Sequence, residues 1–100
     1  MSDFENQITN LKAVTEKNRR AFLETEIETC SIGLERARIE LSLDNSMEAR
    51  KEFSIVSRGI EVIEKFLGEK RVPMPDLEVK LTQLKLDLEA LRKDLDKYPA

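Results

Sequence analysis

The sequence predicts an all-α protein, an antiparallel three-helix bundle with a long first helix and two shorter ones. Three observations support this fold class. Charged residues make up 37% of the chain, glycine and proline occur only three times each, and apolar residues recur at helical spacing. The common residues Leu, Glu, Lys and Arg are strong helix formers. We expect residues 1–100 to form one domain, because a second core would be too small to be stable.

The first predicted helix covers residues 3–43. Proline is absent from this range and Gly33 is its only glycine. A glycine in mid-helix costs about 1 kcal/mol relative to alanine, so we expect Gly33 to mark the close approach of another helix. The predicted core stripe has an unbroken 4-3-4-3-4 spacing and consists of Leu23, Ile27, Cys30, Leu34, Ala37 and Leu41.

The second predicted helix covers residues 46–68. Asp44 and Asn45 precede it as N-cap candidates, with Glu48 placed to complete a capping box with Asn45. Gly68 suits a left-handed C-terminal cap. The core stripe is Ala49, Phe53, Val56, Ile60, Ile63 and Leu67. A second apolar stripe beside it predicts contact with a further helix: Ile55, Gly59, Val62 and Phe66.

The third predicted helix covers residues 75–97. Pro75 suits a first turn, whose dipole Asp76 and Glu78 favour. No basic region precedes this helix, as a DNA-binding zipper would require, so we interpret its leucine seam as intrachain core that packs on the second stripe of the preceding helix. The seam consists of Leu77, Leu81, Leu84, Leu88, Leu91 and Leu95.

Helix lengths predict a projecting N-terminal arm. A helix over residues 3–43 would be about 60 Å long, whereas helices of about 22 residues span only about 33 Å. We therefore expect residues 1–20 to project, with no intrachain neighbour before Ala21. The arm could be disordered, fold back after a break near Asn18, or pack against another chain. The residues predicted to bind a partner are Phe4, Ile8, Leu11, Val14 and Phe22.

The residue inventory argues against catalysis. The chain has no histidine and one cysteine, which removes the commonest general base and a thiolate metal site. We interpret Cys30 as a small buried hydrophobe. Glu24, Glu28 and Glu35 are interpreted as a solvated helix face. We therefore predict no enzyme activity, no catalytic residue, no cofactor or metal, and no small-molecule substrate.

Charge and hydropathy limit the classes of partner. A net charge of −3 and a pI near 5.1 argue against a general affinity for nucleic acid or anionic membranes. No segment approaches the ~20 apolar residues of a membrane span, and the N-terminal segment lacks signal-peptide features, so we expect a cytoplasmic protein. A basic cluster is the one candidate nucleic-acid feature, although it is shorter than the usual basic runs: Lys12, Lys17, Arg19 and Arg20.

Two resemblances support the fold. Residues 28–67 resemble the helical hairpin of tetratricopeptide-type repeats, with small Ala37, Asp44-Asn45 at the turn, and Ala49 four residues before Phe53. The chain is also similar to small bacterial helical proteins, through the E-x-x-T-C motif that ends at Cys30, the segment 60–67 and the leucine-rich third helix. The first resemblance implies protein binding by analogy. The second resemblance supports the fold and gives no indication of an activity.

These observations lead to two hypotheses. The first is a non-enzymatic helical interaction module, a homodimer or the partner of another helix, in which Phe4 to Phe22 form the contact. The alternative is a regulatory protein that binds a nucleic-acid-associated partner through the basic face of Lys12, Lys17, Arg19 and Arg20.

Overall fold

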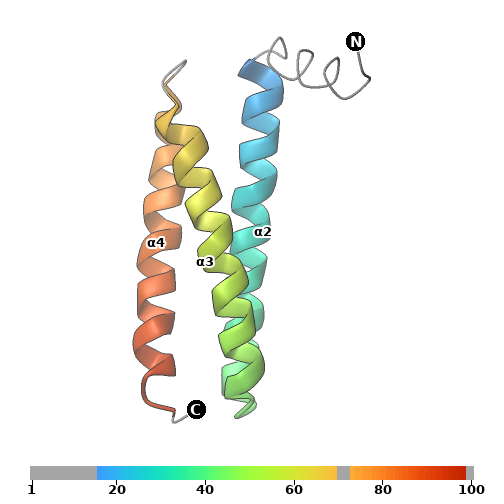
Figure 1. Cartoon of the computed structure of the whole chain (residues 1–100), viewed down its shortest axis with the longest axis vertical. Coiled ribbons are helices and arrows are strands. Elements are labelled where there is room, and N and C mark those ends of the chain that lie inside the picture. Colours follow the sequence, from blue (N-terminus) through green and yellow to red (C-terminus); the bar gives the residue numbers. More distant parts are fainter. Residues whose placement is uncertain (1–15, 70–72, 99–100) are drawn as a thin grey trace, which may run out of the picture.

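The computed structural model of the chain describes residues 16–69 and 73–98. They form three helices: α2 (Glu16–Ser42), α3 (Ser46–Gly68) and α4 (Pro75–Leu95). The helices lie side by side with alternating directions (Figure 1). The predicted three-helix bundle is therefore confirmed. The predicted start of the first helix near residue 3 lies outside the described residues, and the third helix ends at Leu95 rather than at residue 97.

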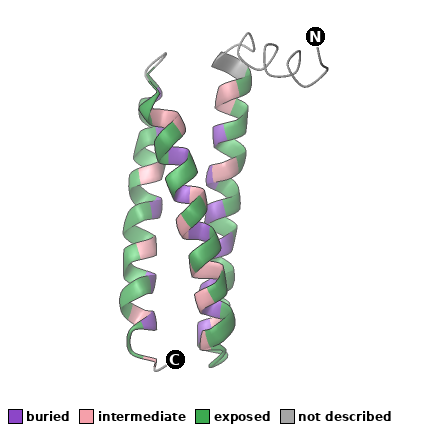
Figure 2. Ribbon diagram, in the orientation of Figure 1, coloured by how far each residue is buried: buried purple, intermediate pink, exposed green. Residues whose placement is uncertain are grey.

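The core follows the predicted stripes. All six stripe residues of α2 are buried, and buried residues line the facing sides of the helices (Figure 2). On α3, Phe53 and Leu67 are only partly buried, as are Leu81 and Leu88 on α4. Burying one such aliphatic side chain contributes about 1.5–3 kcal/mol, so these stripes dominate the stability of the bundle. The other core residues of α3 and α4 are buried: Ala49, Val56, Ile60, Ile63, Leu77, Leu84, Leu91 and Leu95.

Two glycines allow α2 and α3 to approach closely. A Cβ added at Gly33 would lie 2.5 Å from Cγ2 of Val56, and one added at Gly59 would lie 2.7 Å from Sγ of Cys30. Both distances are too short for contacts between non-bonded heavy atoms. The predicted close approach at Gly33 is confirmed, and Val56 fits between the helices because Gly33 has no side chain.

The turn between α2 and α3 closes differently from the prediction. Asp44 has a φ of 58°, and its N–H donates to the Leu41 carbonyl while the Asn45 N–H donates to the Glu40 carbonyl. These two bonds form a Schellman motif that ends α2. The Asn45 side chain donates to the Glu40 carboxylate at 2.7 Å, and α3 has no side-chain cap bond. The predicted capping box is wrong, because Asn45 is used to close the preceding helix.

The C-terminus of α3 also departs from the prediction. Gly68 has a negative φ, so its predicted left-handed cap is wrong. Instead, the guanidinium of Arg19 on α2 donates to the carbonyls of Phe66 and Glu69. A side chain of a neighbouring helix thus satisfies carbonyl groups at the C-terminal end of α3.

Helix α4 is oriented by polar contacts at both ends. Arg20 pairs with Asp76 and Arg38 pairs with Asp94, which connects α4 to α2. These hydrogen bonds lower the pKa of both aspartates. The Arg50 guanidinium of α3 donates to the carbonyls of Leu95 and Tyr98. Exposed ion pairs contribute little stability, so their main effect is to fix the position of α4.

The second apolar stripe of α3 does not pack on α4. Contacts to α4 come from Arg50 and Glu64 of α3. Because successive helical residues are about 100° apart, Ile55 lies about 140° from Arg50 and Val62 about 160° from Glu64. Ile55 is 61% exposed and Val62 is 39% exposed. The prediction that this stripe receives the third helix is wrong, since α4 occupies the other flank of α3.

We expect Gly33→Ala to destabilise the bundle by about 1–3 kcal/mol, because the added methyl group overpacks the contact with Val56. Gly68→Ala is the matched control, since nothing lies within 4 Å of its added Cβ. We expect the control to be neutral or to stabilise by up to about 1 kcal/mol through helix propensity. Urea unfolding measures both variants, and a Gly33→Ala protein as stable as the parent would contradict the close approach.

We expect Asp44→Gly to stabilise the protein by about 1 kcal/mol, because glycine removes the steric cost of the left-handed conformation. The melting temperature should then rise by about 4–8 °C. Asp44→Ala keeps a Cβ at this position and should give no gain. Equal stabilisation by both substitutions would assign the effect to the lost charge instead of to the backbone.

Candidate interaction surface

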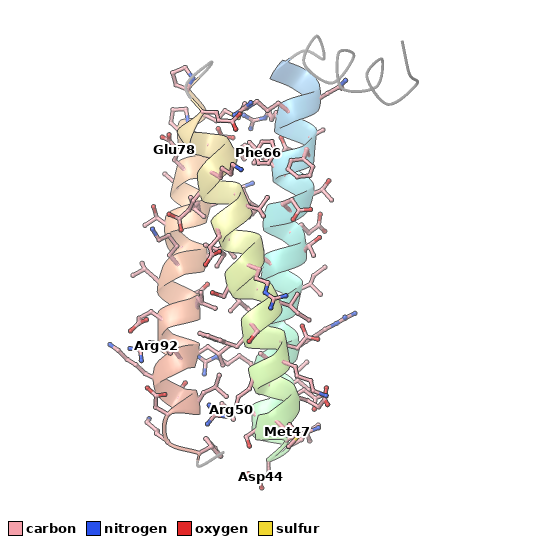
Figure 3. All side chains as sticks on the ribbon, viewed as in Figure 1. Asp44, Met47, Arg50, Phe66, Glu78 and Arg92 are labelled. Carbon is pink, nitrogen blue, oxygen red and sulfur yellow. The ribbon has the colours of Figure 1, made fainter. Side chains whose placement is uncertain are left out.

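One of the predicted partner-binding residues lies within the described structure. Phe22 is 42% exposed, and its ring packs on that of Phe66, with the centroids 5.1 Å apart and the planes tilted by 53°. Figure 3 labels Phe66, which points from α3 toward α2. One side of the Phe22 ring therefore packs on Phe66, while the rest of the ring is exposed to solvent. The other predicted residues lie outside the described residues: Phe4, Ile8, Leu11 and Val14.

Arg19 and Arg20 have intrachain neighbours, which corrects the prediction that the arm lacks them up to residue 20. The Arg19 guanidinium lies 5.7 Å from the centroid of Phe66 and 3.3 Å from the Glu69 carboxylate. Arg20 pairs with Asp76 and Glu24. The comparison of helix lengths missed these contacts because it considered only the backbone. The long arginine side chains reach past the ends of α3 and α4.

The same contacts occupy part of the predicted basic face. The hydrogen bond to Asp76 raises the pKa of Arg20, and the Arg19 side chain is only 15% exposed. A phosphate group would have to displace carboxylates of this chain from both arginines. Lys12 and the side chain of Lys17 lie outside the described residues.

Exposed apolar side chains gather on α2 and α3. Among the described residues, Val79 and Leu86 are the exposed large apolar residues of α4, whereas seven others lie on α2, on α3 or in the turn between them. Sequence reasoning did not single out four of these seven, although residues 32, 39 and 43 follow one outward face of α2 at helical spacing. The seven are Phe22, Ile32, Ile39, Leu43, Met47, Ile55 and Val62.

Two arginines lie among these apolar residues. Arg36 follows Ile32 by one helical turn, and Arg58 lies between Ile55 and Val62. Both are exposed, and neither forms an ion pair within the described part of the chain. Arginine beside exposed apolar residues is typical of protein interfaces, where the guanidinium combines apolar contact with charge.

The described residues present little chemistry. Cys30 is 3% exposed, and burial, assisted by the charge of Glu26, raises the pKa of its thiol. Glu24, Glu28 and Glu35 are exposed, as predicted. Within residues 16–69 and 73–98, no three His, Cys, Asp or Glu side chains gather as a metal site would need. No helix of this described part is long and apolar enough to cross a membrane.

Comparisons with protein-family models, with curated proteins and with solved structures gave no match. The resemblance to a tetratricopeptide-type hairpin therefore stays a prediction from the residues that carry it.

We expect native Cys30 to react with an aromatic disulfide reagent at pH 8 at least about 100-fold more slowly than in concentrated urea, because attack requires an exposed thiolate. Because its pKa is raised above the usual value of 9.0, the thiol stays protonated at higher pH than an ordinary cysteine. The rate should therefore increase as the pH rises through that region. Absorbance of the released thiol follows the reaction, and rapid labelling of the native protein would contradict the buried, inert role.

Proposed function

We propose that this protein is a non-enzymatic helical interaction module that self-associates through the segment Phe4 to Phe22. The observation that carries the proposal is that the bundle leaves apolar side chains of α2 and α3 exposed, among them Ile55 and Val62. The segment that precedes α2 has its own apolar stripe. Exposed contiguous apolar residues usually mark interaction sites.

Helix-in-groove burial is the proposed mechanism. Each large apolar side chain of the segment would contribute about 1.5–3 kcal/mol when fully buried. Association itself costs an estimated 4–15 kcal/mol in lost freedom of motion. Four such side chains from one segment would offset part of this cost, and the reciprocal contact in a symmetric dimer doubles their contribution.

The contacts of Arg19 and Arg20 favour self-association over the alternative function. Both guanidinium groups are held by carboxylates of the chain, so the basic face has less free charge than the sequence suggests. Binding of a nucleic-acid-associated partner through this face stays a prediction. It would appear as a salt-sensitive interaction that Arg19→Glu with Arg20→Glu abolishes.

Sedimentation equilibrium at micromolar concentration tests the proposal. We expect a dimer, and we expect the triple substitution of serine for Phe4, Ile8 and Leu11 to shift it to monomer and to lower helicity, because the apolar contact is lost. Val79→Ser with Leu86→Ser on α4 is the control and should leave the dimer intact. A monomeric parent protein whose triple variant is equally helical would contradict self-association.

A further inference from the structure

We infer that the segment 4–14 of one copy docks on the outer α2–α3 face of a second copy. This face is defined by four apolar residues: Phe22, Ile55, Val62 and Phe66. The inference rests on the proposed self-association and names the surface that receives the segment.

The outer α2–α3 face lies opposite α4. Helix α2 contacts α4 through Arg20 and Arg38. Phe22 lies about 160° around the helix from Arg20, and its ring packs on that of Phe66 of α3. On α3, Ile55 and Val62 point away from the flank that α4 covers. The face is therefore an apolar strip that no other described helix covers.

Two glycines and one aromatic pair set the spacing of α2 and α3 along this strip. Gly33 and Gly59 both lie at the contact between α2 and α3. The Phe22–Phe66 pair closes one end of the strip.

The length of the segment fits this strip. Helix α2 begins at Glu16, so the segment joins the bundle at the end of the face where Phe22 lies. As the helix that its apolar spacing predicts, Phe4 to Val14 spans about 15 Å, and Phe22 to Ile32 on α2 also spans about 15 Å. An antiparallel arrangement then places Val14 at the level of Phe22 and Phe4 at the level of Ile32.

Charge supports the same register. Antiparallel docking brings Asp3 and Glu5, which flank Phe4, to the level of Ile32. The contacts of Gly33 with Val56 and of Gly59 with Cys30 place Arg58 of α3 at this level too, one turn from Arg36. Two acidic residues thus meet two arginines that have no ion pair within the described part of the chain. A parallel arrangement would instead bring Lys12 to these arginines, where like charges repel.

The lack of glycine and proline favours a second copy as the occupant. Neither residue type occurs between Phe4 and Phe22, and glycine and proline are the strongest signals for the tight turn that a reversal onto the same bundle would need. The helix that the apolar spacing predicts for residues 4–14, if continuous with α2, would carry its apolar residues away from its own bundle. Two copies related by a two-fold axis can exchange these segments reciprocally, so that both faces are covered.

A matched pair of substitutions tests the face. Ile55 and Leu86 are both 61% exposed, but only Ile55 lies on the outer α2–α3 face. We expect Ile55→Ser to raise the dimer dissociation constant at least about tenfold, and Leu86→Ser to change it less than about twofold. Equal effects of the two substitutions would overturn the inference.

Charge reversal tests the register. Arg36→Glu with Arg58→Glu should weaken the dimer, and Asp3→Lys with Glu5→Lys in the same chain should restore it, because opposite charges again face each other. Lys93→Glu on α4 is the control and should leave the dimer unchanged. Failure of the compensating change to restore binding would overturn the antiparallel register.

Mixed cross-linking distinguishes a second copy from the chain itself. A Phe4→Cys protein mixed with an Ile55→Cys protein should form a disulfide between chains on oxidation, whereas Phe4→Cys mixed with Leu86→Cys should not. Absence of the first cross-link, while the serine substitutions at Phe4, Ile8 and Leu11 still dissociate the dimer, would overturn the inference and leave the proposed function standing. A monomer in which Phe4→Cys and Ile55→Cys cross-link only within one chain would overturn both.

Discussion

The close approach of α2 and α3 is the constraint on which the rest of the structure depends. Gly33 accepts Val56, and Gly59 accepts the thiol of Cys30. These contacts bring the two core stripes together and bury the only cysteine, which removes its thiol from chemistry.

The position of α4 decides which surface stays exposed. A helix added to a two-helix hairpin can occupy either groove beside the contact line. In this chain, the buried leucines of α4 pack on one side of the hairpin, where Arg20, Arg38 and Arg50 also contact α4. The opposite side keeps Ile55 and Val62 in contact with water. Covering these two side chains with a partner would contribute about 25 cal/mol of free energy per Å² of apolar surface removed from water.

The arginines of α2 and α3 therefore have two different relations to the fold. Arg19 and Arg50 donate to carbonyl groups at the C-terminal ends of α3 and α4, where a cation also interacts favourably with the helix dipole. Arg36 and Arg58 lie on the outer face without a carboxylate partner within the described residues. The difference in pairing, rather than the number of positive charges, distinguishes structural arginines from those that can serve an interface.

The sequence by itself determined the helices, the core stripes, the close approach at Gly33 and the burial of Cys30. These features follow from spacing along one helix, which is a local property. Only the tertiary structure decided which flank of α3 receives α4, because both apolar stripes of α3 satisfy the same helical periodicity. It also decided which groups cap the helix ends. The donor to the C-terminal carbonyls of α3 is the side chain of Arg19, about fifty residues earlier in the chain. The local sequence pattern identifies residues that could form such contacts, and tertiary packing decides which of them do.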